Sequence, residues 1–310
     1  MFKLVQISDP HLGPLPDVEL LQLASKRVLG YINWQRNRAH AMTNSYLDQL
    51  VDDIHAKAPD HIAVCGDLVN IALPKEIEAA KAWLSELGSP ADVSLTPGNH
   101  DAYVPGAFKA ATTEWQAYMS GDDIAHHTMP RPENSLFPWV RVRGCVGLVG
   151  LSTARATGPF MATGHIDSAQ LHELGTALDH LRKQGLFRVV VMHHPPVREA
   201  TKWHKRLVGS SRFRKIIADH GAELILHGHT HKATRMQIAG AHGPVPVVCV
   251  PSASNGLGSH RPAARYNTFE ISGNPGAWQC RMLERGFQQG NTGVTEIATH
   301  TLQIPSGAKP

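Results

Sequence analysis

Short apolar runs rich in β-branched residues recur along the chain, and longer amphipathic stretches separate them. Five of these runs have the length and composition of buried strands, at residues 4–7, 62–65, 93–95, 189–192 and 224–226. Between the first three runs, apolar residues recur at helical spacing over residues 44–57 and 75–87. This βαβαβ start predicts parallel strands joined by right-handed helical crossovers.

The middle and the end of the chain contain further patterns typical of helices and of short strands. Helical spacing predicts helices over residues 107–119, 168–183 and 212–220, and strand patterns fall at residues 139–142 and 146–151. Ser168 is a suitable residue to cap its helix. After residue 231 the pattern changes to short strands with turns, at residues 234–238, 245–250, 266–271 and 278–283. We expect these last strands to form one antiparallel sheet that completes the core.

Two segments stand apart from this predicted core. Residues 13–41 form an insert with apolar residues at helical spacing, and residues 286–310 form an extension rich in Gly, Gln and Thr. We therefore expect one domain over residues 1–285 with the insert inside it. The extension is interpreted either as a simple tail or as an arm onto a partner subunit of a homo-oligomer.

The insert has two interpretations because it leaves directly from a predicted ligand loop. Aromatic and basic side chains could form a lid over an anionic, partly apolar substrate, or contact a membrane surface weakly; they are Tyr31, Trp34, Arg36 and Arg38. Alternatively, the insert is a helix packed on the core with a solvated basic edge. A second basic segment, residues 198–206, could be a mobile loop beside a phosphate site or an ordinary exposed loop.

Composition narrows the class of protein. The chain has 310 residues, of which 42% are apolar and 18% charged, as in globular domains with a large core. A formal net charge of +4 suits an anionic substrate but indicates no specific nucleic-acid partner. Four cysteines without a Cys-x-x-Cys spacing favour reduced thiols. With no signal peptide or long apolar run expected, the cytoplasm is the predicted compartment.

Residues that commonly bind metal ions follow each of the five strand-like runs. In order, the blocks are Asp9-Pro10-His11, Gly66-Asp67, Gly98-Asn99-His100-Asp101, His193-His194 and Gly228-His229-Thr230-His231. Ligands bind outside the carboxyl ends of parallel strands, so we expect all five blocks at one edge of one sheet. In extended segments, residues two apart would project to the same side. The pattern predicts a two-metal site with Asp67 as the bridging carboxylate.

Any one block alone could arise by chance, and two residues keep alternative interpretations. His194 could orient a ligand or simply end a strand. Asp101 could hold the ring of His100 by a hydrogen bond or occupy a turn. The combination of five blocks in this order, each after a strand, is what predicts the site.

The five blocks resemble those of the calcineurin-like metallophosphoesterase superfamily, in the branch of bacterial cyclic-nucleotide and glycerophosphodiester phosphodiesterases. The resemblance covers the chain from Asp9 to His231. It implies an α/β fold, a four-layer sandwich of two mixed β-sheets flanked by helices. It also implies two divalent metal ions, the first bound by Asp9, His11, Asp67 and His231. The second would be bound by Asp67, Asn99, His193 and His229.

The resemblance further implies a phosphodiesterase in which a metal-bridging hydroxide attacks phosphorus in line. His100 would protonate the leaving oxygen or bind the phosphate, with Asp101 and His194 in support. Oxygen and nitrogen ligands suit Mn, Fe, Zn or Mg, with Mn, Fe or Zn favoured. The expected substrate is a small-molecule or lipid-like phosphodiester. The alternatives are a pyrophosphatase acting on nucleotide-linked lipid intermediates and a non-catalytic scaffold with this fold.

Overall fold

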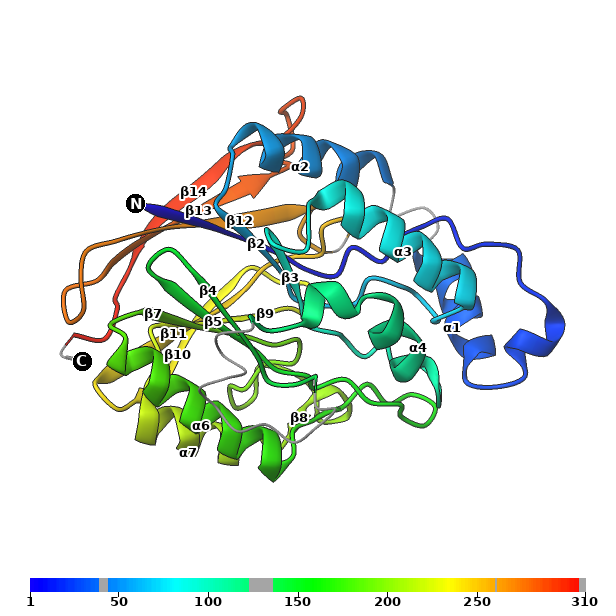
Figure 1. The fold of residues 1–310 in the computed structure, drawn as a ribbon. Coiled ribbons are helices and arrows are strands. Elements are labelled where there is room, and N and C mark those ends of the chain that lie inside the picture. Colours follow the sequence, from blue (N-terminus) through cyan, green and yellow to red (C-terminus); the bar gives the residue numbers. More distant parts are fainter. Residues whose placement is uncertain (39–43, 123–135, 260, 307–310) are drawn as a thin grey trace.

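Two mixed β-sheets lie face to face at the centre of the molecule, and helices cover their outer faces (Figure 1). The computed structural model describes residues 1–38, 44–122, 136–259 and 261–306. Both large sheets have six strands. The predicted four-layer α/β sandwich is therefore confirmed.

The first sheet combines strands from both ends of the chain. Its order is β14 (Thr295–Leu302), β13 (Gln279–Gly286), β12 (Arg265–Ser272), β1 (Phe2–Ile7), β2 (His61–Val64) and β3 (Val93–Leu95). β1, β2 and β3 run parallel, as the βαβαβ pattern predicts. Their crossovers contain α2 (Asn44–Ala56) and α3 (Pro74–Leu87). Both helices lie on the outer face of this sheet (Figure 1).

The second sheet is built from the middle of the chain. Its order is β10 (Thr234–Gly240), β11 (Gly243–Cys249), β9 (Leu224–His227), β7 (Phe187–Val191), β5 (Val146–Gly150) and β4 (Trp139–Arg143). β5, β7, β9 and β11 are parallel. Outside this sheet lie α6 (Ser168–Lys183) and α7 (Ser210–His220) (Figure 1). A small separate sheet pairs β6 (Gly164–His165) with β8 (Leu207–Val208).

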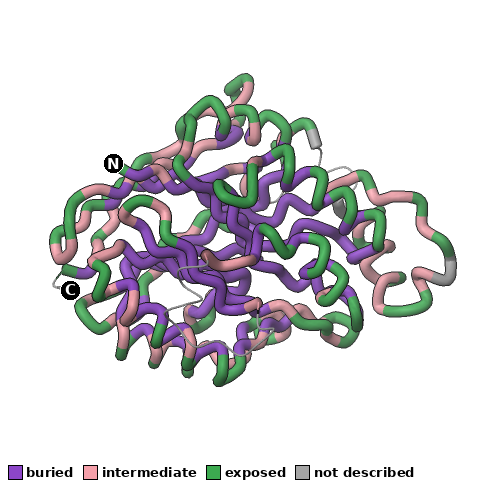
Figure 2. The backbone as a smooth tube through the Cα atoms, viewed as in Figure 1, coloured by how far each residue is buried: buried purple, intermediate pink, exposed green. Residues whose placement is uncertain are grey.

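Alternate residues of the buried strands face two different apolar layers. In β7, Val189 and Val191 belong to the cluster between the two sheets, whereas Val190 belongs to the cluster under α6 and α7. Both faces of such a strand are apolar, which explains the continuous hydrophobic runs in the sequence. Figure 2 shows burial concentrated in the strands, with the outer helix faces exposed.

The structure corrects two predictions about which strands share a sheet. The five ligand-bearing strands are divided, with β1, β2 and β3 in one sheet and β7 and β9 in the other. The four strands after residue 231 are divided as well, because β10 and β11 join the second sheet and β12 and β13 the first. An apolar pattern indicates that a strand is buried but does not show which strand pairs with it.

Two local predictions are also corrected. The cap of α6 is Asp167, whose Oδ1 accepts the backbone N–H of Gln170 at 2.8 Å, and Ser168 is already helical. The helix predicted over residues 107–119 ends early, as α4 (Ala107–Glu114), followed by a 3₁₀ turn (Gln116–Met119). Trp115 lies at the break, fully buried, and its indole N–H donates to the carbonyl of Ile77 at 3.0 Å.

The insert is packed against the core through α1 (Arg27–Asn33), which continues as a π-helical turn (Trp34–Arg38). A Cβ on Gly30 would lie 2.5 Å from the Tyr103 hydroxyl, so the helix backbone approaches this ring closely. Arg27 Nε donates to the carbonyl of Ile71 at 3.0 Å. These contacts support the interpretation of a packed helix. The end of the predicted insert, residues 39–41, lies outside the described residues.

Part of the C-terminal extension forms β14, which pairs antiparallel with β13 of the same chain. A register shift between Glu284 and Arg285 interrupts this pairing. The extension thus adds a strand to the first sheet, and its role as an arm onto a partner subunit stays a prediction.

Candidate metal centre

The five predicted ligand blocks meet at one end of the sandwich, although their strands belong to two sheets. Gly228 N–H donates to the carbonyl of His193 at 3.1 Å, which joins the loops after β9 and β7. His193 Nδ1 lies 2.6 Å from the carbonyl oxygen of Cys65, which follows β2 in the first sheet. The carboxyl ends of both parallel sets therefore converge on one place.

The first group of candidate ligands comprises Asp9, His11 and His231, all buried. His231 Nε2 lies 3.1 Å from Asp9 Oδ1, and His11 Nε2 lies 3.9 Å from the same oxygen. The two imidazole Nε2 atoms are 3.4 Å apart. Their ligand atoms therefore converge on one point, as the ligands of a single metal ion must.

Asp67 lies between this group and the second one. Its Oδ2 is 3.8 Å from Nε2 of His11 and 3.3 Å from Nε2 of His193. A carboxylate that faces ligands of both groups can serve as the bridge between two divalent ions. Asp67 therefore lies where a bridging ligand would have to be, and its bridging role stays a prediction.

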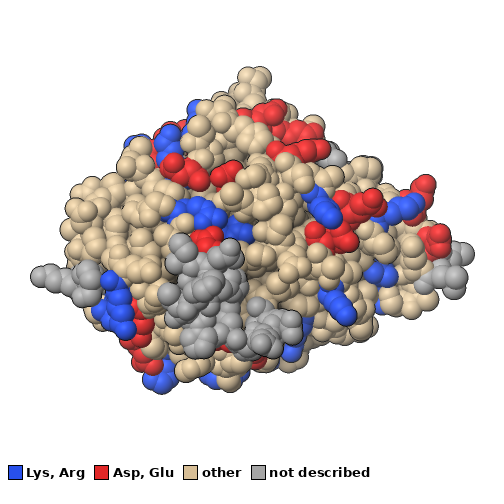
Figure 3. Space-filling view, viewed as in Figure 1, with Lys and Arg blue, Asp and Glu red and all other residues tan. Residues whose placement is uncertain are grey.

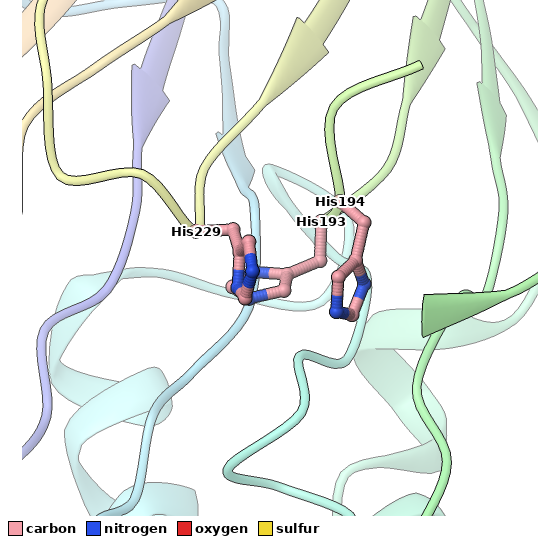
Figure 4. A group of neighbouring side chains, drawn as sticks. All are labelled: His193, His194 and His229. Atoms are coloured by element: carbon pink, nitrogen blue, oxygen red, sulfur yellow. The ribbon is translucent and has the colours of Figure 1, made fainter. Parts of the chain in front are cut away.

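The second group adds Asn99, His193 and His229. His193 Nε2 lies 3.3 Å from Asn99 Oδ1, and the rings of His193 and His229 have centroids 5.1 Å apart. Figure 4 shows the rings of His193, His194 and His229 gathered where the loops after β7 and β9 meet. Each of these three histidines offers a ring nitrogen within 4.8 Å of the others.

Backbone carbonyls hold three of the four histidine ligands in fixed orientations. His11 Nδ1 lies 3.1 Å from the carbonyl oxygen of Val69, which leaves Nε2 to face the centre. His193 is held in the same way through Nδ1. His229 is reversed, because its Nε2 lies 3.1 Å from the carbonyl of Lys205 and Nδ1 remains as its ligand nitrogen. Such contacts select the tautomer that a metal requires.

Most of the ligand residues have backbone conformations that side-chain-bearing residues rarely adopt. Positive φ angles occur at Asp9 (51°), His11 (42°), Asp67 (59°), His229 (69°) and His231 (56°). Both ligand residues of the Asp-x-His and His-x-His segments therefore have positive φ, and the expectation of extended segments was wrong. Strained conformations of this kind persist where the surrounding structure enforces them, and they cluster at functional sites.

Two glycines allow the ligand loops to approach each other closely. A Cβ on Gly98 would lie 2.2 Å from Asp67 Oδ1, and one on Gly228 would lie 1.9 Å from the Ser8 hydroxyl. The Gly228 Cβ would also lie 2.5 Å from Asp9 Oδ2. Any larger residue would displace the carboxylates that the centre needs.

The electrostatics of the centre favour bound cations. Burial would raise the pKa of Asp9, but His231 facing it holds the pKa below its ordinary value. Burial opposes ionisation of Asp67 as well, yet His193 and His100 hold its pKa well below the ordinary range. Burial lowers the pKa of His193, but the facing Asp67 carboxylate outweighs it and raises the pKa to about 9.

One buried atom tests whether the residues fit a metal. Asp9 Oδ1 is buried without a hydrogen-bond partner among the described residues, although it points at the histidine nitrogens. A buried carboxylate oxygen that faces imidazole nitrogens without a hydrogen bond is costly unless a cation pairs with this group of atoms. Together with an all-oxygen and nitrogen donor set, this atom shows that the residues fit divalent metal ions.

Asp101 has a different role from the one predicted. Its carboxylate is fully buried and accepts four backbone N–H groups at 2.7–3.3 Å, from Asp67, Leu68, Val69 and Gly98. It therefore ties the loop after β2 to the loop after β3. The ring of His100 is instead held by the carbonyl oxygen of Asn70, which lies next to its Nδ1.

His100 and His194 both adjoin the ligands. The His100 ring packs edge-on against His11 with centroids 4.7 Å apart and stacks on Tyr103 at 5.4 Å. His194 Nδ1 lies 2.7 Å from the Thr153 hydroxyl, and its ring is 4.4 Å from that of His229. His194 thus packs against a ligand ring, as an orienting group would. The catalytic roles of both histidines stay predictions.

Two cationic residues that belong to no sequence motif, Arg261 and Lys26, lie near the candidate metal centre. Arg261 Nη1 lies 2.7 Å from His231 Nδ1, and Lys26 Nζ lies 4.7 Å from the centroid of the Tyr103 ring. The Arg261 contact requires Nδ1 to accept, so metal ligation through Nε2 would release this guanidinium. Nothing in the sequence pattern marks these residues, because their place depends on distant loops.

Comparison with known proteins agrees with this geometry. The family model described as calcineurin-like phosphoesterase matches residues 2–233. The chain belongs to this family. All five candidate ligand blocks of this calcineurin-like phosphoesterase lie within the matched residues, and each follows a strand. No curated protein matches the sequence significantly.

Solved structures show the same fold at low sequence identity. A dimetal phosphatase from Danio rerio is 12% identical, with a TM-score of 0.57 and coverage of 98% of this chain and 99% of that chain. A purple acid phosphatase from yellow lupin (Lupinus luteus) seeds is 11% identical, with a TM-score of 0.56. This chain is covered to 96% and the lupin chain to 53%. These similarities show the calcineurin-like phosphoesterase fold.

Proposed function

We propose that the protein is a binuclear metal-dependent phosphodiesterase that hydrolyses a small-molecule or lipid-like phosphodiester. The observation that carries the proposal is the position of Asp67 Oδ2, which faces Nε2 of both His11 and His193 at less than 4 Å. Bound there, divalent ions would lower the pKa of water and stabilise charge on the phosphoryl oxygens. Manganese, iron or zinc suits this donor set.

The hydrolysis also needs a group that donates a proton to the leaving oxygen or binds the phosphate. In hydrolysis a bond forms between water oxygen and phosphorus, the ester P–O bond breaks, and the leaving oxygen takes a proton. We assign to His100 the donation of that proton or the binding of the phosphate, and its half-buried position beside Asn99 supports this assignment. Its ring is held by the Asn70 carbonyl and stacked on Tyr103, which limits its motion.

Hydrolysis of bis(p-nitrophenyl) phosphate tests the proposal. We expect metal-dependent turnover by the wild type and a loss of roughly 100-fold or more in kcat for Asp67→Asn and Asn99→Ala. Asp219→Asn is the matched control, because Asp219 is an exposed residue of α7 paired with Lys215. Full metal-dependent activity in Asp67→Asn would contradict the proposal. Fewer than about one bound ion per chain after reconstitution would favour a non-catalytic scaffold.

The alternative, a pyrophosphatase acting on nucleotide-linked lipid intermediates, is supported by the pocket beside the centre. This pocket carries both basic residues and apolar residues of the insert, such as Leu29 and Ile32. A panel of cyclic AMP, a glycerophosphodiester and a UDP-linked lipid separates the two candidates. Preference for the diphosphate linkage of the UDP-linked lipid would replace the phosphodiesterase assignment.

Several expectations about partners stay predictions. Among the described residues, no helix is long and apolar enough to span a membrane. On the face drawn in Figure 3, basic and acidic side chains are interspersed across the surface. The cytoplasmic compartment, weak contact with a membrane surface, a homo-oligomer and the lack of a specific nucleic-acid partner are proposed on the sequence argument alone.

A further inference from the structure

A pocket of about 810 Å³ opens beside the metal centre and reaches the ligand Asn99 and the neighbouring His100. Segments far apart in the sequence line it beside the candidate ligand loops: the insert, residues 160–162, the turn at Trp203–Lys205, and Asn255, Ser259 and Arg261. The described lining residues include four cationic side chains and no Asp or Glu; the cations are Lys26, Arg36, Lys205 and Arg261. This surplus of positive charge lies outside the ligand set itself.

Lys26 is the best defined of these cations. Its Nζ donates to the Thr157 hydroxyl and to the carbonyl of Met161, each at 2.8 Å, and lies over the ring of Tyr103. The Lys26 side chain is half-buried, and this burial lowers its pKa to about 8. A partly desolvated cation gains more from an anion than a fully hydrated one does.

Arg261 lines the same pocket from a segment far along the chain from the insert. It is half-buried, and its guanidinium reaches the outer ring nitrogen of the ligand His231 at 2.7 Å. Arg36 is exposed and approaches from the insert. The four cations therefore come from three separate parts of the chain: the insert, the turn at Trp203–Lys205 and Arg261.

The insert holds its cations in place because its helix is docked. Arg27 Nε and Nη2 donate to the carbonyls of Ile71 and Ala72 at 3.0 and 2.6 Å. The close approach of Gly30 to Tyr103 fixes the same helix against the core. Lys26 directly precedes this helix, so its position beside the centre is set by the packing of the fold.

The number of cations exceeds what a simple phosphodiester needs. Two divalent ions would already outweigh the two ligand carboxylates and the single negative charge of a phosphodiester. Four further cations without an acidic neighbour in the lining would disfavour a neutral alcohol portion and favour an anionic one. An anion in the pocket would also relieve the repulsion among these cations.

We propose that this pocket binds a second anionic group of the substrate, so that the enzyme prefers phosphoesters whose alcohol portion carries a further phosphate. The inference rests on the proposed phosphoesterase function and deepens it. In this proposal, Lys26 and Arg36 determine specificity at a site next to the scissile ester.

A matched pair of chromogenic esters tests the proposal. The first is thymidine 5′-(p-nitrophenyl phosphate), and the second is the same ester with an additional 3′-phosphate. We expect kcat/KM of the metal-loaded wild type to be about tenfold or more higher for the second ester, as one charge-assisted contact gives. Lys26→Met and Arg36→Met should each move this ratio toward one. Lys215→Met, an exposed lysine on α7, is the matched control and should keep the wild-type ratio.

A binding measurement accompanies the kinetics. Titration of the protein with thymidine 3′,5′-bisphosphate and with thymidine 5′-monophosphate should show tighter binding of the bisphosphate, and Lys26→Met should reduce the difference. Arg36 is exposed, so Arg36→Met decides the question if Lys26→Met does not fold. Equal kcat/KM for both esters in the wild type, or a ratio unchanged in both variants, would overturn the proposal. No turnover of either ester would overturn the proposed function and this inference with it.

Discussion

Asp101 lies directly behind Asp67, and its Oδ2 accepts the backbone N–H of the bridging residue at 2.9 Å. The same oxygen accepts Gly98 N–H at 2.7 Å, so one buried carboxylate joins two ligand loops. Burial, followed by the repulsion of the Asp67 carboxylate, raises the pKa of Asp101 to about 7. Asp67 can keep its strained backbone and its position between the two histidine groups because this carboxylate holds it from behind.

Replacement of Asp101 should loosen the whole centre. Asp101→Asn keeps one acceptor oxygen but turns an amide N–H₂ toward backbone donors, so at least two hydrogen bonds are lost. We expect a loss of about 2–4 kcal/mol in the free energy of unfolding by urea, together with weaker metal binding in a titration. Asp219→Asn, on the surface, should change neither quantity by more than about 0.5 kcal/mol. Wild-type metal affinity in Asp101→Asn would contradict this role.

The close approach of Gly98 to Asp67 predicts a steric effect. Gly98→Ala would bring a methyl group to 2.2 Å from Asp67 Oδ1, so the carboxylate must move. We expect a loss of roughly 100-fold or more in turnover of bis(p-nitrophenyl) phosphate, because the bridge is displaced. The control is Gly158→Ala, where an added Cβ has no neighbour within 4 Å. Equal activity of the two variants would show that the loop adapts to the methyl group.

Removal of metal should lower stability measurably. A ligand that binds only the folded state stabilises it by about 2.7 kcal/mol when its concentration is 100 times the dissociation constant. Chelation should therefore lower Tm by several degrees, and added Mn²⁺ or Zn²⁺ should restore it. The effect should disappear in Asp67→Ala, which lacks the bridge. A Tm that is independent of chelator would argue against resident ions.

Buried His61 predicts a pH dependence of folding that is separate from the metal centre. Its Nε2 lies 2.7 Å from the Ser94 hydroxyl, and burial, then Arg143 and Arg141, lowers its pKa from 6.5 to about 3. The unfolded chain binds the His61 proton more readily, so this contribution to stability is complete above about pH 6.5 and is lost as pH falls toward 3.

Between pH 6.5 and 4.5 the loss should be roughly 2–3 kcal/mol in the free energy of unfolding. Urea unfolding of wild type and His61→Gln over this range measures it, and the variant should show a shallower dependence on pH. The control is His172→Gln, because His172 is exposed on α6. Identical slopes for wild type and His61→Gln would refute the assignment.

Much of this centre could be predicted from the sequence because the relevant signals are local. Asp9, Asp67 and His193 each follow a short apolar strand, and carboxylate and imidazole groups at strand ends indicate metal binding without knowledge of distant contacts. The two-sheet sandwich was predicted through resemblance to the family, whereas the apolar runs alone suggested a single sheet.

Other features could not be predicted because they depend on which segments meet. Asp101 was assigned to the ring of His100, since adjacent residues are the natural partners in a sequence, but its hydrogen bonds go to loops that only folding brings together. The extended geometry expected for Asp9 and His11 was wrong. Both residues have positive φ, and their loop is held by contacts with the neighbouring strand end, such as Asp9 N–H to the Gly66 carbonyl at 2.9 Å.

The sequence by itself determined the chemistry of the ligands, because residue type and strand pattern are properties of short segments. Only the tertiary structure decided the surroundings of that chemistry. Lys26 and Arg261 are more than 200 residues apart, yet both line one pocket, because the packing of α1 and the return of the chain to the first sheet place them there. Contacts of this range depend on the closure of the whole sandwich, which no local pattern encodes.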